Sequence, residues 1–137
     1  MTTLAADKPR EFLLGELAEY PVIASDIIYE GAAVGENASG YARPLAAQDP
    51  FLGFAQRTVD NSAGGAGAKT VVVKRKGVIK LPISGLAITA NDRPKVYASD
   101  DDTFTLTSTS NTLIGTVLQW IETGYAYVEF DANGMAV

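Results

Sequence analysis

The segment from Lys95 to Phe130 constrains the fold more than any other, because apolar and polar side chains alternate along four short runs within it. The runs are separated by Asp, Asn, Ser and Gly, which are the residues that favour turns. In the last run, Ala126 and Val128 alternate with Tyr125 and Tyr127. Alternation with a period of two residues is typical of an antiparallel sheet that buries one face. This segment therefore predicts four strands, and in the second of them it places Phe104 and Leu106 on one face.

Shorter β-rich runs fill the rest of the chain. Phe51 to Ala55 is typical of an apolar strand, in which Gly53 indicates a bulge or a close backbone approach. Thr70 to Ile83 indicates a strand pair, and Gly77 is either its hairpin turn or a bulge within one bent strand. Pro82 favours an edge position. We therefore expect an all-β fold, a small antiparallel barrel or sandwich for which a β-clip-like arrangement is one option.

A chain of 137 residues is expected to form one domain. Residues 1–11 show neither helical nor strand periodicity, so we expect a flexible, extended N-terminal arm followed by a single β domain over residues 12–137. Residues 12–20 favour one helical turn or a short strand, and residues 46–50 a helical turn. The start of the sequence has no basic leader before an apolar core, so no secretory signal is expected.

Composition makes several classes of function less favourable. The chain has no cysteine, which excludes disulfides, and no histidine, which excludes a Ser-His-Asp arrangement within it. Carboxylate, lysine or tyrosine catalysis remains available, so the expectation that this is not an enzyme rests on the absent histidine and on the threonine- and glycine-rich build. The formal net charge of −5 argues against nucleic acid and anionic membranes as partners. No apolar run reaches the length of a spanning helix.

Two segments are candidates for contact with a partner. Lys74, Arg75 and Lys76 form the only basic run; they are either a solvated strand edge that discourages aggregation or a patch that meets acidic groups. The arm, with Thr2, Thr3 and Leu4 at its tip, is either a frayed terminus or a segment that becomes ordered on a partner by strand addition.

Aromatic residues supply a third candidate surface. Tyr125 and Tyr127 fall on the face opposite the predicted core residues of their strand, and Trp120 lies in the strand before it. Tyrosine and tryptophan are enriched at interfaces because they bury large areas and keep a polar group. These three residues predict a contact between copies, with a sugar platform and simple burial between two layers as the alternatives.

Two further motifs carry weaker signals. Asp100, Asp101 and Asp102 provide oxygen ligands, but adjacent residues of an extended chain point in alternate directions and lack the spacing of a calcium loop, so an acidic turn is favoured. The glycine-rich stretch from Asp60 to Ala68 precedes Lys69 without the glycine that a phosphate-binding loop requires, and a β-rich run follows it. We expect a flexible surface loop there, and no metal, cofactor or catalytic site in the chain.

Five motifs occur in an order that resembles the capsid cement, or head decoration, proteins of tailed bacteriophages. The similarity extends from about Pro21 to Phe130, and the arm lies outside it. The motifs that carry the resemblance are Ile28-Tyr29-Glu30-Gly31-Ala32-Ala33-Val34, Gly40-Tyr41-Ala42-Arg43-Pro44, the segment from Asp60 to Val73, Val96-Tyr97-Ala98-Ser99-Asp100-Asp101 and Ile114-Gly115-Thr116-Val117.

This resemblance implies a non-enzymatic structural protein on the outer surface of the virion, made in the host cytoplasm. Its implied partners are the major capsid protein of the phage head and two further copies of itself in a homotrimer. On this interpretation Thr2, Thr3, Leu4, Lys74, Arg75 and Lys76 are the candidates for capsid contact, and Trp120, Tyr125 and Tyr127 are the candidates for the trimer interface. A carbohydrate- or receptor-binding β-module of a virion surface remains the alternative, and an enzyme is the least favoured interpretation.

Overall fold

The computed structural model describes residues 5–11 and 13–133, and it is built almost entirely of antiparallel strands in two five-stranded sheets and a two-stranded one. The first sheet has the order β1 (Leu17–Pro21), β7 (Thr70–Lys74), β5 (Phe51–Ala55), β3 (Ala33–Glu36), β4 (Ala42–Pro44). The second has the order β10 (Phe104–Thr105), β9 (Lys95–Ala98), β11 (Thr112–Glu122), β12 (Tyr125–Asp131), β8 (Lys76–Pro82). The small sheet pairs β2 (Asp26–Ile28) with β6 (Val59–Asn61), and one 3₁₀ helix, η1, covers Ile88–Asp92.

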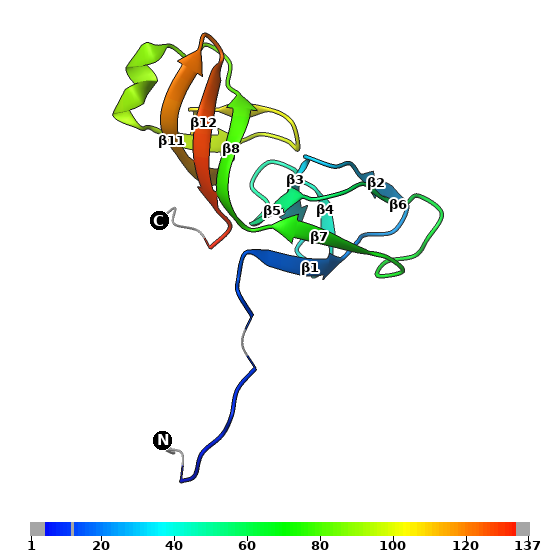
Figure 1. Ribbon diagram of the computed structural model, residues 1–137. Helices are drawn as coiled ribbons and strands as arrows, with labels where there is room; N and C mark the ends of the chain where they lie inside the picture. The colour runs from blue at the N-terminus through cyan, green and yellow to red at the C-terminus, as the bar shows by residue number, and fades with distance from the viewer. Residues whose placement is uncertain (1–4, 12, 134–137) are drawn as a thin grey trace.

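The all-β prediction is confirmed, in a sandwich-like form in which neither large sheet closes into a barrel (Figure 1). A single isolated bridge between Ile83 and Phe104 connects the two ends of the second sheet at one point only. The residues predicted to be a helical turn before β5 form an ordinary turn instead, in which the Asp49 N–H donates to the Ala46 carbonyl at 3.0 Å.

The four strands predicted between Lys95 and Phe130 are β9 to β12. In β12 the alternation is regular: Ala126 and Val128 are fully buried, and Tyr125 and Tyr127 are exposed. The second run is shorter than predicted, because β10 ends at Thr105, and Leu106 is 40% exposed and does not share the buried face.

Four phenylalanines hold the two large sheets together. Phe54 in β5 lies at their centre, with ring centroids 5.4 Å from Phe51, 4.9 Å from Phe130 and 6.1 Å from Phe104. The contacts with Phe51 and Phe130 are edge-to-face, the arrangement that aromatic quadrupoles favour. Phe51 and Phe54 belong to the first sheet and the other two to the second, so this cluster is the main apolar contact between the sheets.

One bent strand runs through both large sheets. β7 and β8 are separated only by Arg75, so the chain leaves the first sheet and enters the second without a hairpin. Of the two predicted roles of Gly77, the bend is therefore the observed one, and its φ of 147° favours glycine. A Cβ on Gly53 would lie 2.4 Å from the Lys74 carbonyl oxygen, which confirms the predicted close approach. Pro82 lies on an edge strand, as predicted.

A partly exposed ion pair between Arg43 and Asp49 holds the turn before β5, and the backbone of Asp49 connects this turn to the second sheet. Asp49 accepts two hydrogen bonds from the Arg43 guanidinium, at 2.7 and 2.9 Å, and a third from the Ala46 amide at 3.0 Å. Its carbonyl oxygen accepts from the Thr112 hydroxyl of β11 at 2.8 Å. Burial on its own would raise the pKa of Asp49, but the hydrogen bonds from Arg43 and Ala46 outweigh it and lower that pKa. A Cβ on Gly35 would lie 2.5 Å from the carboxylate, so this position needs glycine.

Asp49→Asn is expected to lower the free energy of unfolding by about 1–3 kcal/mol at neutral pH, the usual size for hydrogen bonds to a charged group. Because folding lowers the pKa of Asp49, its stabilisation is complete above the ordinary value of 3.8 and is lost as the pH falls below it. The difference in the free energy of unfolding between wild type and variant should therefore become smaller at acidic pH. Urea unfolding at neutral pH and below pH 3.8 measures it, with the exposed arm residue Asp7→Asn as the control. A difference that stays constant with pH would contradict this role.

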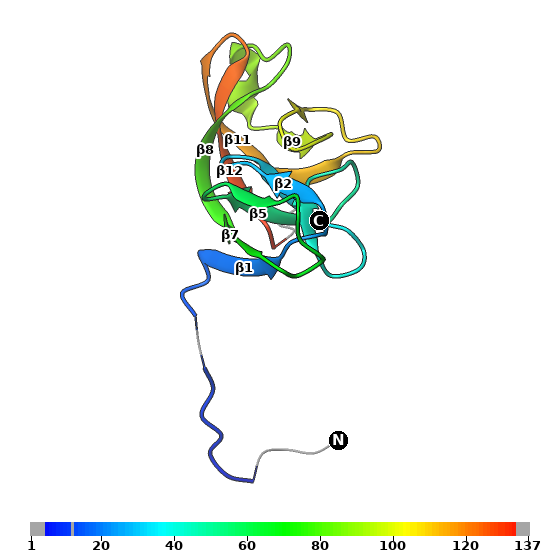
Figure 2. The same cartoon turned by 90° about the vertical axis from the view of Figure 1, so that its right-hand side faces the viewer.

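The N-terminal arm extends away from both sheets. Figures 1 and 2, which differ by a quarter turn, both show it running from the start of β1 into open space. Every residue from Ala5 to Glu11 is exposed, and the first strand, β1, begins only at Leu17. This geometry confirms an extended arm; Thr2, Thr3 and Leu4 at its tip lie outside the described residues.

Candidate interaction surfaces

The outer face of the second sheet carries exposed aromatic and aliphatic side chains on neighbouring strands. Tyr125 is 40% exposed and Tyr127 is 42% exposed, and Val78 on the adjacent β8 is 53% exposed. Lys80 lies opposite Tyr127 in the register and places its ammonium 5.1 Å from the centroid of the Tyr125 ring. This is a cation–π contact, in which the ammonium is attracted to the face of the tyrosine ring. A face of this composition suits contact with another protein.

Trp120 does not join this surface. In the register it lies opposite Ala126, on the buried side of the sheet, whereas Gln119 lies opposite Tyr127. It packs against the main core, and its indole nitrogen is buried without a hydrogen-bond partner among the described residues. Of the three predicted trimer residues, the structure therefore brings together Tyr125 and Tyr127 and separates them from Trp120.

The basic run lies at the bend between β7 and β8. Lys74 and Lys76 are exposed, but Arg75 is half-buried. The Arg75 guanidinium donates to the Gly15 carbonyl at 3.0 Å and also to the Asn133 side chain. Arg75 therefore holds the root of the arm, while the two lysines remain available to a partner.

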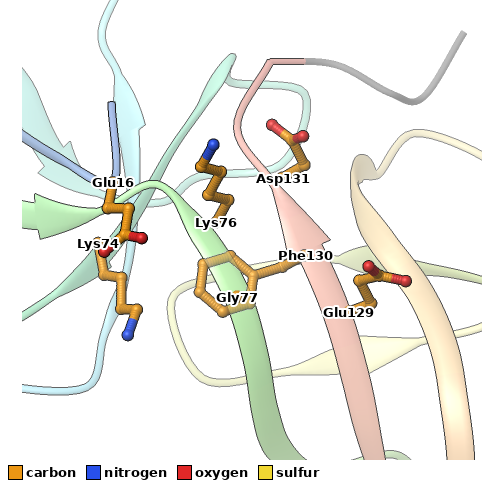
Figure 3. A pocket seen from close by; sticks show the side chains of 7 residues that line it. All are labelled: Glu16, Lys74, Lys76, Gly77, Glu129, Phe130 and Asp131. Atoms are coloured by element: carbon orange, nitrogen blue, oxygen red, sulfur yellow. The ribbon is translucent and has the colours of Figure 1, made fainter. Parts of the chain in front are cut away.

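A shallow pocket of about 360 Å³ opens at the same bend (Figure 3). The Phe130 ring lies against Gly77, with Glu16 and Lys74 on one side and Asp131 on the other. Its charged groups are mixed in sign, so the pocket can accept a polar or apolar side chain but has no strong preference for ligands of one charge.

Exposed leucines at the root of the arm are the feature that sequence reasoning missed. Leu13 is 81% exposed and Leu14 is 95% exposed, and Leu17 in β1 is 47% exposed. Leaving such side chains in water costs the free energy that burial would give them, about 1.5–3 kcal/mol each. The signal in the sequence was a leucine pair placed before Gly15, which has a φ of 87° and turns the chain away from the body.

The acidic run forms the predicted turn. Asp100 accepts hydrogen bonds from the Asp102 amide at 2.8 Å and the Thr103 hydroxyl at 3.0 Å, which joins β9 to β10. Burial, followed by the nearby carboxylates of Asp100, Asp102 and Asp26, raises the pKa of Asp101. Within residues 5–11 and 13–133, no group of three or more acidic side chains is arranged to hold a metal ion.

The glycine-rich stretch is a turn anchored to the body. Asn61 is almost fully buried and donates to the carbonyls of Ile23, at 2.8 Å, and Gly65, at 3.0 Å. The stretch leads into β7, so no helix N-terminus follows it as a phosphate-binding loop would require. Across the described part of the chain, no helix has the length and apolar character needed to cross a membrane.

No family model matches the chain, and no curated protein matches it.

Proposed function

We propose that this chain is a capsid cement protein, which binds the outer surface of an assembled phage head and stabilises it. The observation that carries the proposal is the combination of a compact all-β body with an extended, exposed arm. An exposed arm suits attachment to a neighbouring protein by strand addition. The motif order that resembles cement proteins supports the same function.

The exposed surfaces are proposed as contacts with two partners. The arm and the exposed lysines at the bend, Lys74 and Lys76, are the proposed contacts with the major capsid protein. Tyr125 and Tyr127 on the outer sheet face are the proposed contacts in a homotrimer, since a cyclic assembly joins one patch to a different patch and closes after three copies. The protein would act on the outside of the virion.

A cement protein stabilises its lattice by mass action. If it binds only the expanded shell, each occupied site gains roughly 2.7 kcal/mol at a concentration one hundred times the dissociation constant. Summed over many sites, this resists the outward pressure of packed DNA even when each contact is modest. The alternative is a carbohydrate- or receptor-binding module of a virion surface, which the exposed Tyr29, Tyr125 and Tyr127 would serve.

Co-sedimentation with phage heads tests the proposal. We expect saturable binding to expanded heads and none to unexpanded heads, because the lattice that the protein stabilises exists only after expansion. The solution mass, measured on wild type and on Tyr125→Ala/Tyr127→Ala, tests the self-contact in the same preparation. Folded protein that binds neither form of head would overturn the cement function, and a glycan screen would then test the alternative.

A further inference from the structure

The strand β8 has an open edge. It is the last strand of its sheet, and among the described residues no strand pairs with its other side between Lys76 and Pro82. The Ile83 amide donates to the Gly124 carbonyl at 2.8 Å, on the side of β12. Backbone groups of alternate residues point to opposite sides of a strand, so those of Val78 and Lys80 point to the open edge. Such an edge is a template for a further strand.

Apolar surface lies on both faces of this edge. Val78 is 53% exposed on the outer face. Ile79, on the inner face, lines a pocket of about 270 Å³ that opens at this edge and also has Val78, Phe54 and Phe130 among its walls. A strand added here would therefore bury one apolar side chain on each face.

The root of the arm has the matching pattern. Successive side chains of an extended segment point to opposite faces, so Leu13 and Leu14 present one leucine to each face. When Leu13 lies beside Val78, Leu14 lies over the inner pocket. Both leucines are almost fully exposed in the single chain, and this placement covers them and Val78 together.

Charges favour the same register. In an extended added strand, Glu11 would share the face of Leu13, two residues later, while Lys76 and Lys80 each lie two residues from Val78 and share its face. Glu11 therefore meets a lysine whichever way the added strand runs. Exposed lysines on an edge discourage pairing between two β8 edges or with an arbitrary strand, so they select a strand that carries an acid here.

The protein's own arm starts on the wrong side of the strand. The Arg75 amide donates to the Glu16 carbonyl, and the Arg75 carbonyl accepts from the Ala132 amide, both at 2.8 Å. The two backbone groups of one extended residue point to the same side, so β1 and β12 share one side of the bent strand. The arm leaves from that side (Figure 1), opposite the open edge of β8.

We infer that the open edge of β8 binds the segment from Glu11 to Leu14 of a second copy as an added strand. This inference goes beyond the proposed function and holds for the protein whether or not it binds a capsid. The contact is heterologous, because an arm meets an edge, so repeating it produces a ring or an open chain.

Cysteine cross-linking tests the pairing directly, because the chain has no cysteine of its own. Leu13→Cys and Val78→Cys are prepared separately, mixed and oxidised gently. Residues opposite each other in adjacent strands have Cα separations of roughly 4.5–5.5 Å, within the range of a disulfide. We expect a mixed disulfide between the two variants, formed at least about tenfold faster than between Leu13→Cys and the exposed control Leu106→Cys, because pairing raises the effective concentration.

Each outcome decides the inference. Equal rates with the control would show random collision and overturn it. An intramolecular disulfide in the double variant Leu13→Cys/Val78→Cys, with none in the mixture, would assign the edge to the protein's own arm and overturn it. The inference would also be overturned if the folded protein formed no disulfide at all.

A charge reversal provides a second readout that needs no cysteine. Glu11→Lys is expected to lower the solution mass of the assembly at a fixed protein concentration, and Lys76→Glu/Lys80→Glu in the same chain is expected to restore it. Oppositely charged pairs across strands stabilise, and like charges destabilise. A mass that does not respond to Glu11→Lys would contradict the strand pairing, whereas loss of head binding alone would bear only on the proposed function.

Discussion

Phe54→Ala is expected to lower the free energy of unfolding by about 3–5 kcal/mol, the usual cost of removing a buried aromatic side chain. Phe54 is 4% exposed and is the only described phenylalanine whose ring contacts three others, one from its own sheet and two from the second. Its removal leaves a cavity between the sheets that β5, fixed by pairing on both sides, cannot close. Because the free energy of unfolding of such domains is about 5–15 kcal/mol, the variant should lose a large share of its stability.

Urea unfolding monitored by circular dichroism measures the effect. Phe54→Leu is the matched control, because it keeps most of the volume and should cost about 1–1.5 kcal/mol, as volume-conserving swaps do. Leu106→Ala, at an exposed position, sets the baseline. If Phe54→Ala cost no more than Leu106→Ala, the aromatic cluster would not be what holds the sheets together.

The faces of the strands were accessible from the sequence where alternation is regular. Ala126, Val128 and Phe130 alternate with Tyr125, Tyr127 and Glu129, and burial follows that alternation without exception. The same reasoning fails for β11, because its register shifts between Val117 and Gln119. After that irregularity Trp120 faces the core, although strict alternation from the buried Val117 would place it outside.

Contacts between residues far apart in the chain could not be predicted from the sequence. Aspartate is common in turns, so the sequence predicts only a turn at Asp49. The structure shows that Asp49 also accepts hydrogen bonds from Arg43 and from the distant Thr112. Asn61 belongs to a stretch that looks like a flexible loop, yet its side chain is buried and its amide nitrogen donates to the backbone carbonyls of Ile23 and Gly65. A buried polar side chain is stable only with partners, and those partners lie on segments that the sequence does not join.

In the candidate surfaces, too, local features could be predicted from the sequence, whereas features that depend on distant contacts could not. The exposure of Tyr125 and Tyr127 could be predicted from the local alternation, and the basic run could be read directly from the sequence. The different role of Arg75 was not, because it depends on Gly15 and Asn133, which come from the two ends of the chain. Leucines are usually buried, so a leucine pair in the sequence indicates core rather than the exposed arm root that Leu13 and Leu14 form.

Deleting Met1 to Arg10 is expected to weaken binding to expanded phage heads by at least about tenfold, or ~1.4 kcal/mol, without changing the free energy of unfolding. The second half of this expectation follows from the structure: residues 5–10 are exposed, and Leu13, Leu14 and all strands remain. The first half rests on the proposed role of the arm, whose extended chain offers unpaired backbone groups to a strand of the capsid protein. Those bonds exist only in the complex.

Co-sedimentation titrations with intact and truncated protein measure the change. A chain with residues 1–10 in reversed order is the matched control, because it preserves length, composition and net charge. Weak binding by both altered chains would show that the arm is recognised through its sequence, whereas recovery by the reversed chain would indicate that backbone pairing and charge suffice. Binding of the truncated protein at wild-type affinity would exclude the arm tip, including Thr2, Thr3 and Leu4, as a capsid contact and would leave the lysines at the bend as the remaining candidates.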